Sequence, residues 1–450
     1  MAGFFDGLKN LVANLGTSRD KSFATEYTQP GLTLEQTLYA YRSSWLAKKI
    51  VNIPAMDSVR QWRDWQAESD AITLIEAEEK RLQLRQKLRK ALKAARIYGG
   101  GAIYIGTDDA DLMEPLAVDR IGQGGVRYLT NMSPMTLSAG EPETDTASEF
   151  YNQPRYWRTT WRDGASTDIH PSRLVILIGE DLPPDDPMEI SGWGDSVLAA
   201  VIDSVKASDA TMANVASLVF ESKIDVIRIP EMMARLSEPG YVDALQTRFN
   251  LAMTGKGING SLILDKDEEY DQKQTSFSSL PDVMDRFFQA VAGAADIPMT
   301  RLLGMSPGGL NASGESDTRN YYDAIKSKQE LEIGPAMHRL DEALIRSALG
   351  VRPPDVHYIW SSLWQITETE RAALGKTTAE TVTSLYNTGL FLPEVLGKVA
   401  ANTLVEDGVF PGLEAAIAEF GTPEGDQLGD PNSTEVQAAL AGMQTTQGGQ

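Results

Sequence analysis

Residues 195–221 read DSVLAAVIDSVKASDATMANVASLVFE, and their apolar side chains recur every three or four residues. The repeating positions are Leu198, Val201, Val205, Ser208, Met212, Val215 and Val219. Alternation between steps of three and four is the heptad pattern of a helix that packs along a second helix. Alanines beside this seam allow another helix to approach closely. The segment therefore predicts a long helix whose partner is either a helix of the same chain or one in a ring of copies.

A second, shorter helix is predicted at residues 279–295. Pro281 lies in its first turn, where a missing backbone N–H is tolerated, and Asp282 and Asp285 suit the positive end of the helix dipole. One face is apolar and consists of Leu280, Met284, Phe287, Phe288 and Val291. Between the two helices we predict a strand at 224–229, a helix at 232–253, a turn at 256–260, a strand at 261–264 and an acidic run at 265–271.

The stretch LGMSPGGLNASGES, residues 303–316, is rich in glycine, serine, asparagine and proline. That composition is typical of a loop, because these residues favour turns over helices and strands. A long helix is predicted after it, from Asp317 to Leu349, with a kink at Pro335 because proline removes a backbone hydrogen bond. Gly350 is expected to end this helix, and a strand is predicted at 356–364.

The N-terminal part of the chain predicts helices followed by small sheets. We expect helices interrupted at Pro54 over residues 34–65, and one long charged helix over 71–98 that ends at three glycines. In nucleotide-binding loops the glycines follow a strand and open a helix, whereas here they follow a helix and open a strand. Short strands are predicted at 102–105, 126–129, 156–161 and 174–178. The fold class is therefore α+β and mainly helical.

Trp62 and Trp65 lie three residues apart, close to Arg60 and Arg63. Arginine side chains can stack on aromatic rings, which gives one interpretation of this cluster. Burial of both tryptophans in a structural joint is the interpretation that we favour.

The bulk composition limits the classes of function. The chain has 450 residues, a formal net charge of −22, no cysteine and three histidines. Proteins that hold nucleic acid tightly are usually basic, so the charge argues against that class. No run of about twenty apolar residues predicts a membrane span. Residues 1–16 lack the pattern of a secretory signal, and their apolar face predicts a helix docked on its own chain or on a neighbouring subunit. A membrane-surface helix is the less favoured alternative, since Lys9 is the only basic residue in this stretch.

Motifs for catalysis are not found in the sequence. The histidines His170, His338 and His357 lie far apart and form no HExxH motif, and there is no GxSxG motif. The TGKG at residues 254–257 lacks the glycine spacing and the following Ser or Thr of a phosphate-binding loop. We therefore predict that the chain is not an enzyme and has no cofactor and no metal site.

Four stretches carry a resemblance to a known family. They are SWLAKKIVNIPAMDSVRQW (44–62), ARIYGGGAIYIG (95–106), IHPSRLVILIGEDLP (169–183) and AADIPMTRLLGMSPGGLNASGESDTRNYYD (294–323). Together with the order of the predicted elements, they resemble one family of tailed-bacteriophage portal proteins, long catalogued as an uncharacterised phage-associated family. The resemblance covers residues 30–350, and the last stretch is the most specific.

The resemblance implies a portal fold with wing, stem, clip and crown regions that assembles as a ring. The implied layout is an N-terminal arm (1–33), an α+β wing (34–192), a first stem helix (193–222), a clip (223–276), a second stem helix (277–297), a tunnel loop (298–316), a long kinked wing helix and strand (317–365), a helical crown (366–422) and a disordered tail (423–450).

The resemblance also implies a function and partners. Such a protein forms a ring of about twelve subunits at one capsid vertex of the virion. Double-stranded DNA is packaged and ejected through the ring without sequence specificity. The ring contacts the major capsid protein, docks the terminase and later the head–tail adaptor, and is assembled in the host cytoplasm without a membrane partner.

Candidate site residues follow from this layout. Those of the tunnel loop near DNA are Gly304, Met305, Ser306, Leu310, Asn311 and Ser313. Those for packing between stem helices of neighbouring subunits are Leu198, Val201, Val205, Met212, Val215, Val219, Met284, Phe287 and Val291. Those for contact between the clip and a partner are Lys256 and Asn259.

The acidic charge is compatible with a DNA conduit, because acidic groups that line a channel repel phosphate and let DNA slide. The basic helix that holds Arg85 and Arg96 is a candidate for pairing with a neighbouring subunit or for slowing DNA. Two alternatives stay open. One is a phage nucleic-acid-processing enzyme, either a metal-dependent hydrolase or a nucleotide-binding packaging factor, and the other is a different ring-forming virion component such as an adaptor.

Overall fold

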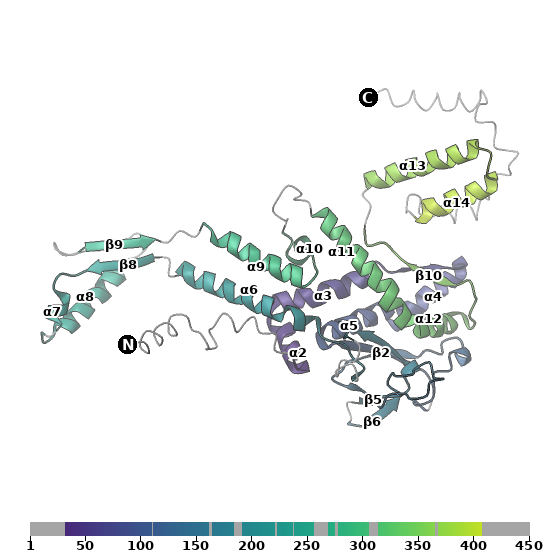
Figure 1. The fold of residues 1–450 in the computed structure, drawn as a ribbon, viewed down its shortest axis with the longest axis horizontal. Coiled ribbons are helices and arrows are strands. Elements are labelled where there is room, and N and C mark those ends of the chain that lie inside the picture. The colour runs from purple at the N-terminus through teal and green to yellow at the C-terminus, as the bar shows by residue number, and fades with distance from the viewer. Residues whose placement is uncertain are drawn as a thin grey trace, which may run out of the picture. The chain divides into compact units, whose positions relative to one another are not determined.

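The computed structural model describes residues 32–109, 111–161, 164–183, 191–220, 223–236, 238–255, 269–274, 278–305, 314–364 and 368–406 (Figure 1). The chain divides into two compact units, Met1–Leu363 and Trp364–Gln450. Helices alternate with four small sheets, so the predicted α+β, mainly helical class is confirmed. Among the described residues, no helix is long and apolar enough to cross a membrane. The predicted arm up to residue 31 and the predicted tail lie outside the described residues.

The first two helices are α2 (Leu34–Ser43) and α3 (Trp45–Arg60). Thr33 begins α2 with a capping box, in which its side chain and that of Gln36 each accept a backbone N–H. The boundary between the two helices is Ser44, whose hydroxyl caps α3. Helix α3 runs through Pro54 without interruption. The prediction of an interruption at Pro54 is therefore wrong.

Pro54 is tolerated because a distant side chain replaces the missing donor. A proline at this position leaves the Ile50 carbonyl without its helical N–H partner. The Arg96 Nη2 atom donates to that carbonyl at 3.1 Å. The Ser58 hydroxyl also donates to the Pro54 carbonyl at 2.9 Å. The helix therefore keeps its hydrogen bonds through tertiary structure.

The long charged segment forms two helices, α4 (Ser69–Leu82) and α5 (Leu84–Tyr98), where the sequence predicted one. The break is at Gln83, which adopts a left-handed conformation with φ of 54°. This change of direction lets Leu82 and Leu84, on either side of it, both be buried in the same core. Tertiary packing here outweighs a sequence that favours a continuous helix.

After α5 the chain enters a three-stranded antiparallel sheet of order β3-β2-β7, with β2 (Gly100–Gly106), β3 (Tyr128–Met132) and β7 (Leu174–Ile178). Gly99 caps α5 with φ of 82°, and a Cβ at this position would lie 2.1 Å from the Gly194 carbonyl oxygen. A Cβ on Gly101 would lie 2.2 Å from the Ala91 carbonyl oxygen. The glycines therefore permit close packing between the helix, the sheet and the segment before α6.

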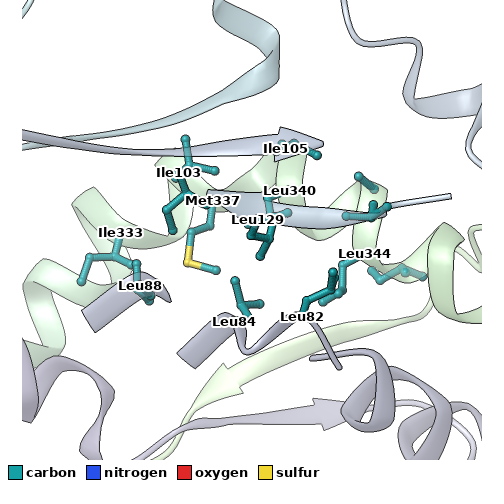
Figure 2. Packing of buried hydrophobic residues seen from close by; sticks show 14 of the residues in the cluster. Leu82, Leu84, Leu88, Ile103, Ile105, Leu129, Ile333, Met337, Leu340 and Leu344 are labelled. Atoms are coloured by element: carbon teal, nitrogen blue, oxygen red, sulfur yellow. The ribbon is translucent and has the colours of Figure 1, made fainter. Parts of the chain in front are cut away.

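One face of this sheet contributes to the largest hydrophobic core (Figure 2). Ile103, Ile105 and Leu129 of the sheet meet side chains from the α4–α5 joint and from α12 (Gly334–Leu349). The labelled side chains from these helices are Leu82, Leu84, Leu88, Met337, Leu340 and Leu344, together with Ile333. The other face packs on the small sheet β4-β5-β6, formed by β4 (Leu137–Ala139), β5 (Trp157–Thr160) and β6 (Ser166–Ile169).

A two-stranded sheet pairs β1 (Arg63–Gln66) with β10 (His357–Trp360). Arg63 is fully buried between Glu79, at 2.7 Å, and Asp341, at 2.6 Å. Its guanidinium lies over the rings of Trp62, Trp65 and Tyr358 at 5.3, 4.8 and 4.4 Å. Both interpretations of the tryptophan cluster therefore apply at once, because the aromatic rings of the structural joint stack on a buried arginine.

The predicted seam helix is α6 (Val197–Phe220), and it packs along α9 (Leu280–Ala294) of the same chain. Between them lie β8 (Lys223–Arg228), α7 (Met232–Arg235), α8 (Tyr241–Gly255) and β9 (Glu269–Gln274). Strands β8 and β9 pair antiparallel. Part of the segment predicted as an acidic run is thus a strand, while the strand predicted at 261–264 lies outside the described residues.

The third long helical segment contains an irregular turn. It begins with α11 (Glu315–Lys328), continues through a π-helical turn at Gln329–Ile333, and ends with α12 at Gly350, whose φ is 79°. The Gly334 N–H bonds to the Gln329 carbonyl, five residues back, just before Pro335. Pro335 has no N–H for the Leu331 carbonyl, and the wider turn accommodates this. In the second unit, α13 (Glu368–Asn387) packs on α14 (Pro393–Glu406).

Candidate assembly and channel site

A second hydrophobic cluster joins α6 and α9 to α3, α10 (Met299–Leu303) and α11. Leu198, Val201 and Val291 are fully buried in it, and Val205 is 1% exposed. The inner half of the predicted seam is therefore used within one chain, which is the internal alternative that the sequence left open. Leu198, Val201 and Val291 leave no exposed surface for a neighbouring copy.

The outer half of the seam is more accessible. Met212, Val215, Met284 and Phe287 are half-buried, and the side chain of Val219 lies outside the described part of the structure. The alanines beside the seam are exposed at positions 200, 207, 210, 213 and 216. Packing between neighbouring subunits stays a prediction for these residues.

The predicted tunnel loop begins with a short helix and not with a loop. Residues 299–303 form α10, and Gly304 follows with φ of 73°. Met305 is 38% exposed. The other four loop candidates, Ser306, Leu310, Asn311 and Ser313, lie outside the described residues, as do the clip candidates Lys256 and Asn259.

Both ends of this loop are fixed to one buried carboxylate, Asp57 of α3. Arg301 of α10 donates to its two oxygens, from Nε at 3.0 Å and from Nη2 at 2.8 Å. The Tyr321 hydroxyl of α11 donates to Asp57 Oδ2 at 3.0 Å. Asp57 is 0% exposed, so these charge-assisted bonds form in a region of low dielectric constant.

The protonation of this cluster follows from its surroundings. The hydrogen bond to Asp57 raises the pKa of Arg301, although burial acts in the opposite direction. Burial, followed by the charge of Asp57, raises the pKa of Tyr321 well above its ordinary value. Tyr321 therefore stays a neutral hydrogen-bond donor at physiological pH.

Two further contacts support the loop ends. Lys49 Nζ of α3 donates to the Leu302 carbonyl at 2.7 Å. The hydroxyls of Thr300 and Thr318 lie 3.4 Å apart, and the Thr318 hydroxyl donates to the Gly314 carbonyl at 2.8 Å. The sequence interpretation missed this anchor. The available signal was an acidic residue on a face of α3 that otherwise buries Ile50 and Pro54.

The histidines lie in ordinary structural settings. His170 Nδ1 lies 2.8 Å from the Ser172 hydroxyl, and burial, with Arg339 and Arg173 nearby, lowers its pKa. His357 Nδ1 lies 2.9 Å from the Asp355 carbonyl oxygen. Within the ranges given above, no three His, Asp or Glu side chains are grouped to hold a metal ion.

Comparison with known proteins gives the class of this chain. Residues 35–384 match the family model described as phage portal protein. The chain therefore belongs to the phage portal protein family, which is a structural family and not a catalytic one.

Three relatives share most of this chain. Two are named anti-CBASS protein Acb1. The one from Caulobacter sp. (strain RHG1) is 40% identical over 445 residues, covering 96% of this chain and 70% of that protein. The one from Sphingomonas paeninsulae is 40% identical over 423 residues, covering 92% of this chain and 67% of that protein. An uncharacterized protein of Haemophilus influenzae (strain ATCC 51907 / DSM 11121 / KW20 / Rd) is 32% identical over 454 residues, covering 96% and 98%.

Solved structures also match. A chain in the neck of an empty GTA particle has a TM-score of 0.49 and 15% identity, with 80% of this chain and 93% of that chain covered. A HK97 family phage portal protein from Corynebacterium diphtheriae has a TM-score of 0.35 and 11% identity, with 68% and 92% covered.

Proposed function

We propose that this chain is one subunit of a ring, of about twelve copies, at one vertex of a tailed-phage capsid. Double-stranded DNA would enter and leave the virion through this ring. The terminase would dock on it during packaging, the head–tail adaptor afterwards, and the major capsid protein would surround it. Membership of the portal family supports this role, and assembly in the host cytoplasm belongs to the same proposal.

The structural observation that carries the proposal is the anchored loop. Asp57 holds α10 and α11 together near the end of α9, so the described helices on either side of residues 306–313 are fixed to each other beside the predicted stem. A loop of small residues on a rigid base can contact DNA without reading its sequence. We place Gly304, Met305, Ser306, Leu310, Asn311 and Ser313 in this role, and Lys256 and Asn259 in contact with the terminase or the adaptor.

The ring and the loop are tested separately. Class averages of the purified chain in electron microscopy should show rings with a central hole wide enough for duplex DNA, and a protein that stays monomeric would contradict the proposal. Removal of residues 306–313 should leave ring formation intact and reduce the yield of packaged DNA. Normal yield in that variant would exclude a role of the loop in packaging or retention.

The name of two relatives suggests a second function, anti-CBASS activity. The matched region covers 98% of the Haemophilus influenzae protein but only 70% and 67% of the two proteins with that name. We assign the portal role to the shared region and expect that expression of the present chain leaves the defence of a CBASS-bearing host intact. Loss of CBASS defence on its expression would support the second function. ATP- or metal-dependent turnover by the pure chain would instead support the enzymatic alternative.

A further inference from the structure

The outer surface of α5 carries a row of cations without acidic partners. Helix α5 has six basic residues and no acidic residue. Five of them form what we call the basic face: Arg85, Lys87, Arg89, Lys90 and Lys93. Arg85 and Lys90 are exposed, and the other three are half-buried. In a chain with a net charge of −22, such a concentration of positive charge is local to this helix.

The side chains of the basic face rest on uncharged groups of the same chain. Arg85 Nε donates to the Val59 carbonyl at 2.7 Å. Arg89 Nη1 lies 3.7 Å from the sulfur of Met56, and Lys93 Nζ lies 5.5 Å from the centre of the Tyr41 ring. In the part of the chain that the structure describes, none of the five forms an ion pair.

Most of the described arginines elsewhere in the same unit behave differently. Ion pairs with a carboxylate within 4.0 Å are formed by Arg63, Arg81, Arg127, Arg158, Arg173, Arg301, Arg339, Arg346 and Arg352. Single cations elsewhere among the described residues, such as Lys48 and Arg120, also form no ion pair, but on α5 five such residues lie on one helix. Unpaired like charges on one helix repel one another, which costs stability unless a partner neutralises them.

Exposed acidic side chains occur on β1, at the N-cap of α4 and along α4, a helix that also exposes Lys80. These acidic side chains, which we call the acidic face, are those of Asp64, Glu68, Asp70 and Glu76. All four are exposed, and no ion pair is formed by them within the described ranges. Helix α4 packs on α12, whereas α5 packs on α3 and β2, because Gln83 breaks the helix between them. The helices that carry the two charged faces therefore pack against different elements of the same chain.

We propose that the basic face of one subunit binds the acidic face of the next copy in the ring. This inference rests on the ring proposed above. A closed ring uses two different complementary patches on every subunit, and the chain carries one patch of each sign. Because the rest of the chain is strongly acidic, another copy supplies the opposite charge that the basic face lacks.

The test uses charge reversal in the full-length chain. The double variant Lys87→Glu/Lys90→Glu alters two residues of the basic face whose side chains form no bond with the other described residues of the chain. The double variant Asp70→Lys/Glu76→Lys alters the acidic face. Each should raise the protein concentration needed for ring formation at least about tenfold, measured by sedimentation velocity and electron microscopy. The quadruple variant should restore rings, which also shows that the substituted subunits still fold.

A control with the same change in net charge is Arg155→Glu/Lys376→Glu, whose side chains are 68% and 78% exposed and lie outside both faces. It should form rings like the unaltered chain. Normal rings in the basic-face variant would overturn the inference and leave the ring itself established. Failure of the quadruple variant to restore rings would overturn the pairing of these two faces.

Two other outcomes concern function. Intact rings with a loss of duplex DNA binding would instead assign the basic face to DNA. Absence of rings in the unaltered chain would reject the proposed function.

Discussion

Arg63 holds a buried positive charge between two carboxylates and three aromatic rings. Burial lowers its pKa, but Asp341 and Glu79 more than compensate, so the net pKa lies above its ordinary value and the guanidinium stays charged. Burial raises the pKa of Asp341, and the positive charge of Arg63 opposes this increase. The joint between β1, α4 and α12 therefore depends on one cation.

Substitution of Arg63 by methionine keeps much of the volume and removes the charge. Glu79 and Asp341 would then be buried without a counter-charge, which typically costs about 3–5 kcal/mol. We expect a loss of that size in the free energy of unfolding, measured with urea. The control Arg158→Met breaks the exposed pair with Asp168 and should have a much smaller effect. Equal effects of the two substitutions would contradict this account of the joint.

Gly99 combines a left-handed backbone with a close contact. Gly99→Ala places a Cβ 2.1 Å from the Gly194 carbonyl oxygen at a φ of 82°. Gly124 also has a positive φ, of 69°, but a Cβ added there would meet no atom within 4 Å. We expect Gly124→Ala to cost about 1 kcal/mol, from the backbone alone, and Gly99→Ala to cost clearly more. Thermal melting of both variants measures the difference, and similar melting temperatures would refute the importance of the contact.

At the scale of elements, Asp57 connects α3 to α10 and α11. Asp57→Asn keeps the shape of the side chain but removes the charge that holds Arg301. We expect rings to form and the yield of packaged DNA to fall, as for the shortened loop, because the loop ends lose their fixed position. The matched control is Asp168→Asn, since Asp168 accepts a similar bidentate pair from Arg158 on an exposed strand. Unchanged yield in Asp57→Asn would show that the anchor has no part in DNA handling.

Local patterns predicted several elements because their causes are local. The heptad seam gives α6, Pro281 and an apolar face give α9, the apolar run at 174–178 gives β7, and Gly350 ends α12. The failures depend on distant residues. The donor that lets α3 continue through Pro54 lies 46 residues from the carbonyl it serves, and the break at Gln83 follows from a core shared with α12. The anchor at Asp57 joins residues 244 and 264 positions apart, a pairing that no local pattern contains.

For the whole molecule, the net charge of −22 per chain has a direct consequence. Twelve copies would carry a formal charge of −264, and a surface of that sign repels phosphate. We expect assembled rings to bind free duplex DNA only weakly at physiological ionic strength, measured by fluorescence anisotropy. The control is a variant that exposes the basic face, Asp70→Lys/Glu76→Lys, whose unassembled subunits should bind the same duplex more tightly. Tight, salt-resistant binding by intact rings would contradict a conduit through which DNA slides.

The π-helical turn at Gln329–Ile333 has a geometric consequence for the rod that contains it. Such a turn holds one residue more than an ordinary helical turn, so every later side chain is rotated by about 100° around the axis. Before the turn, Tyr321 and Ile325 face the cluster around α6 and α9, and after it Met337 and Leu340 face the core of the sheet. Leu331, within the turn, is 77% exposed and belongs to neither of the two hydrophobic clusters. The one additional residue thus lets a single continuous helix pack into two separate cores. Deletion of that residue would rotate the side chains of α12 away from the core of the sheet, although the side chains themselves would be unchanged.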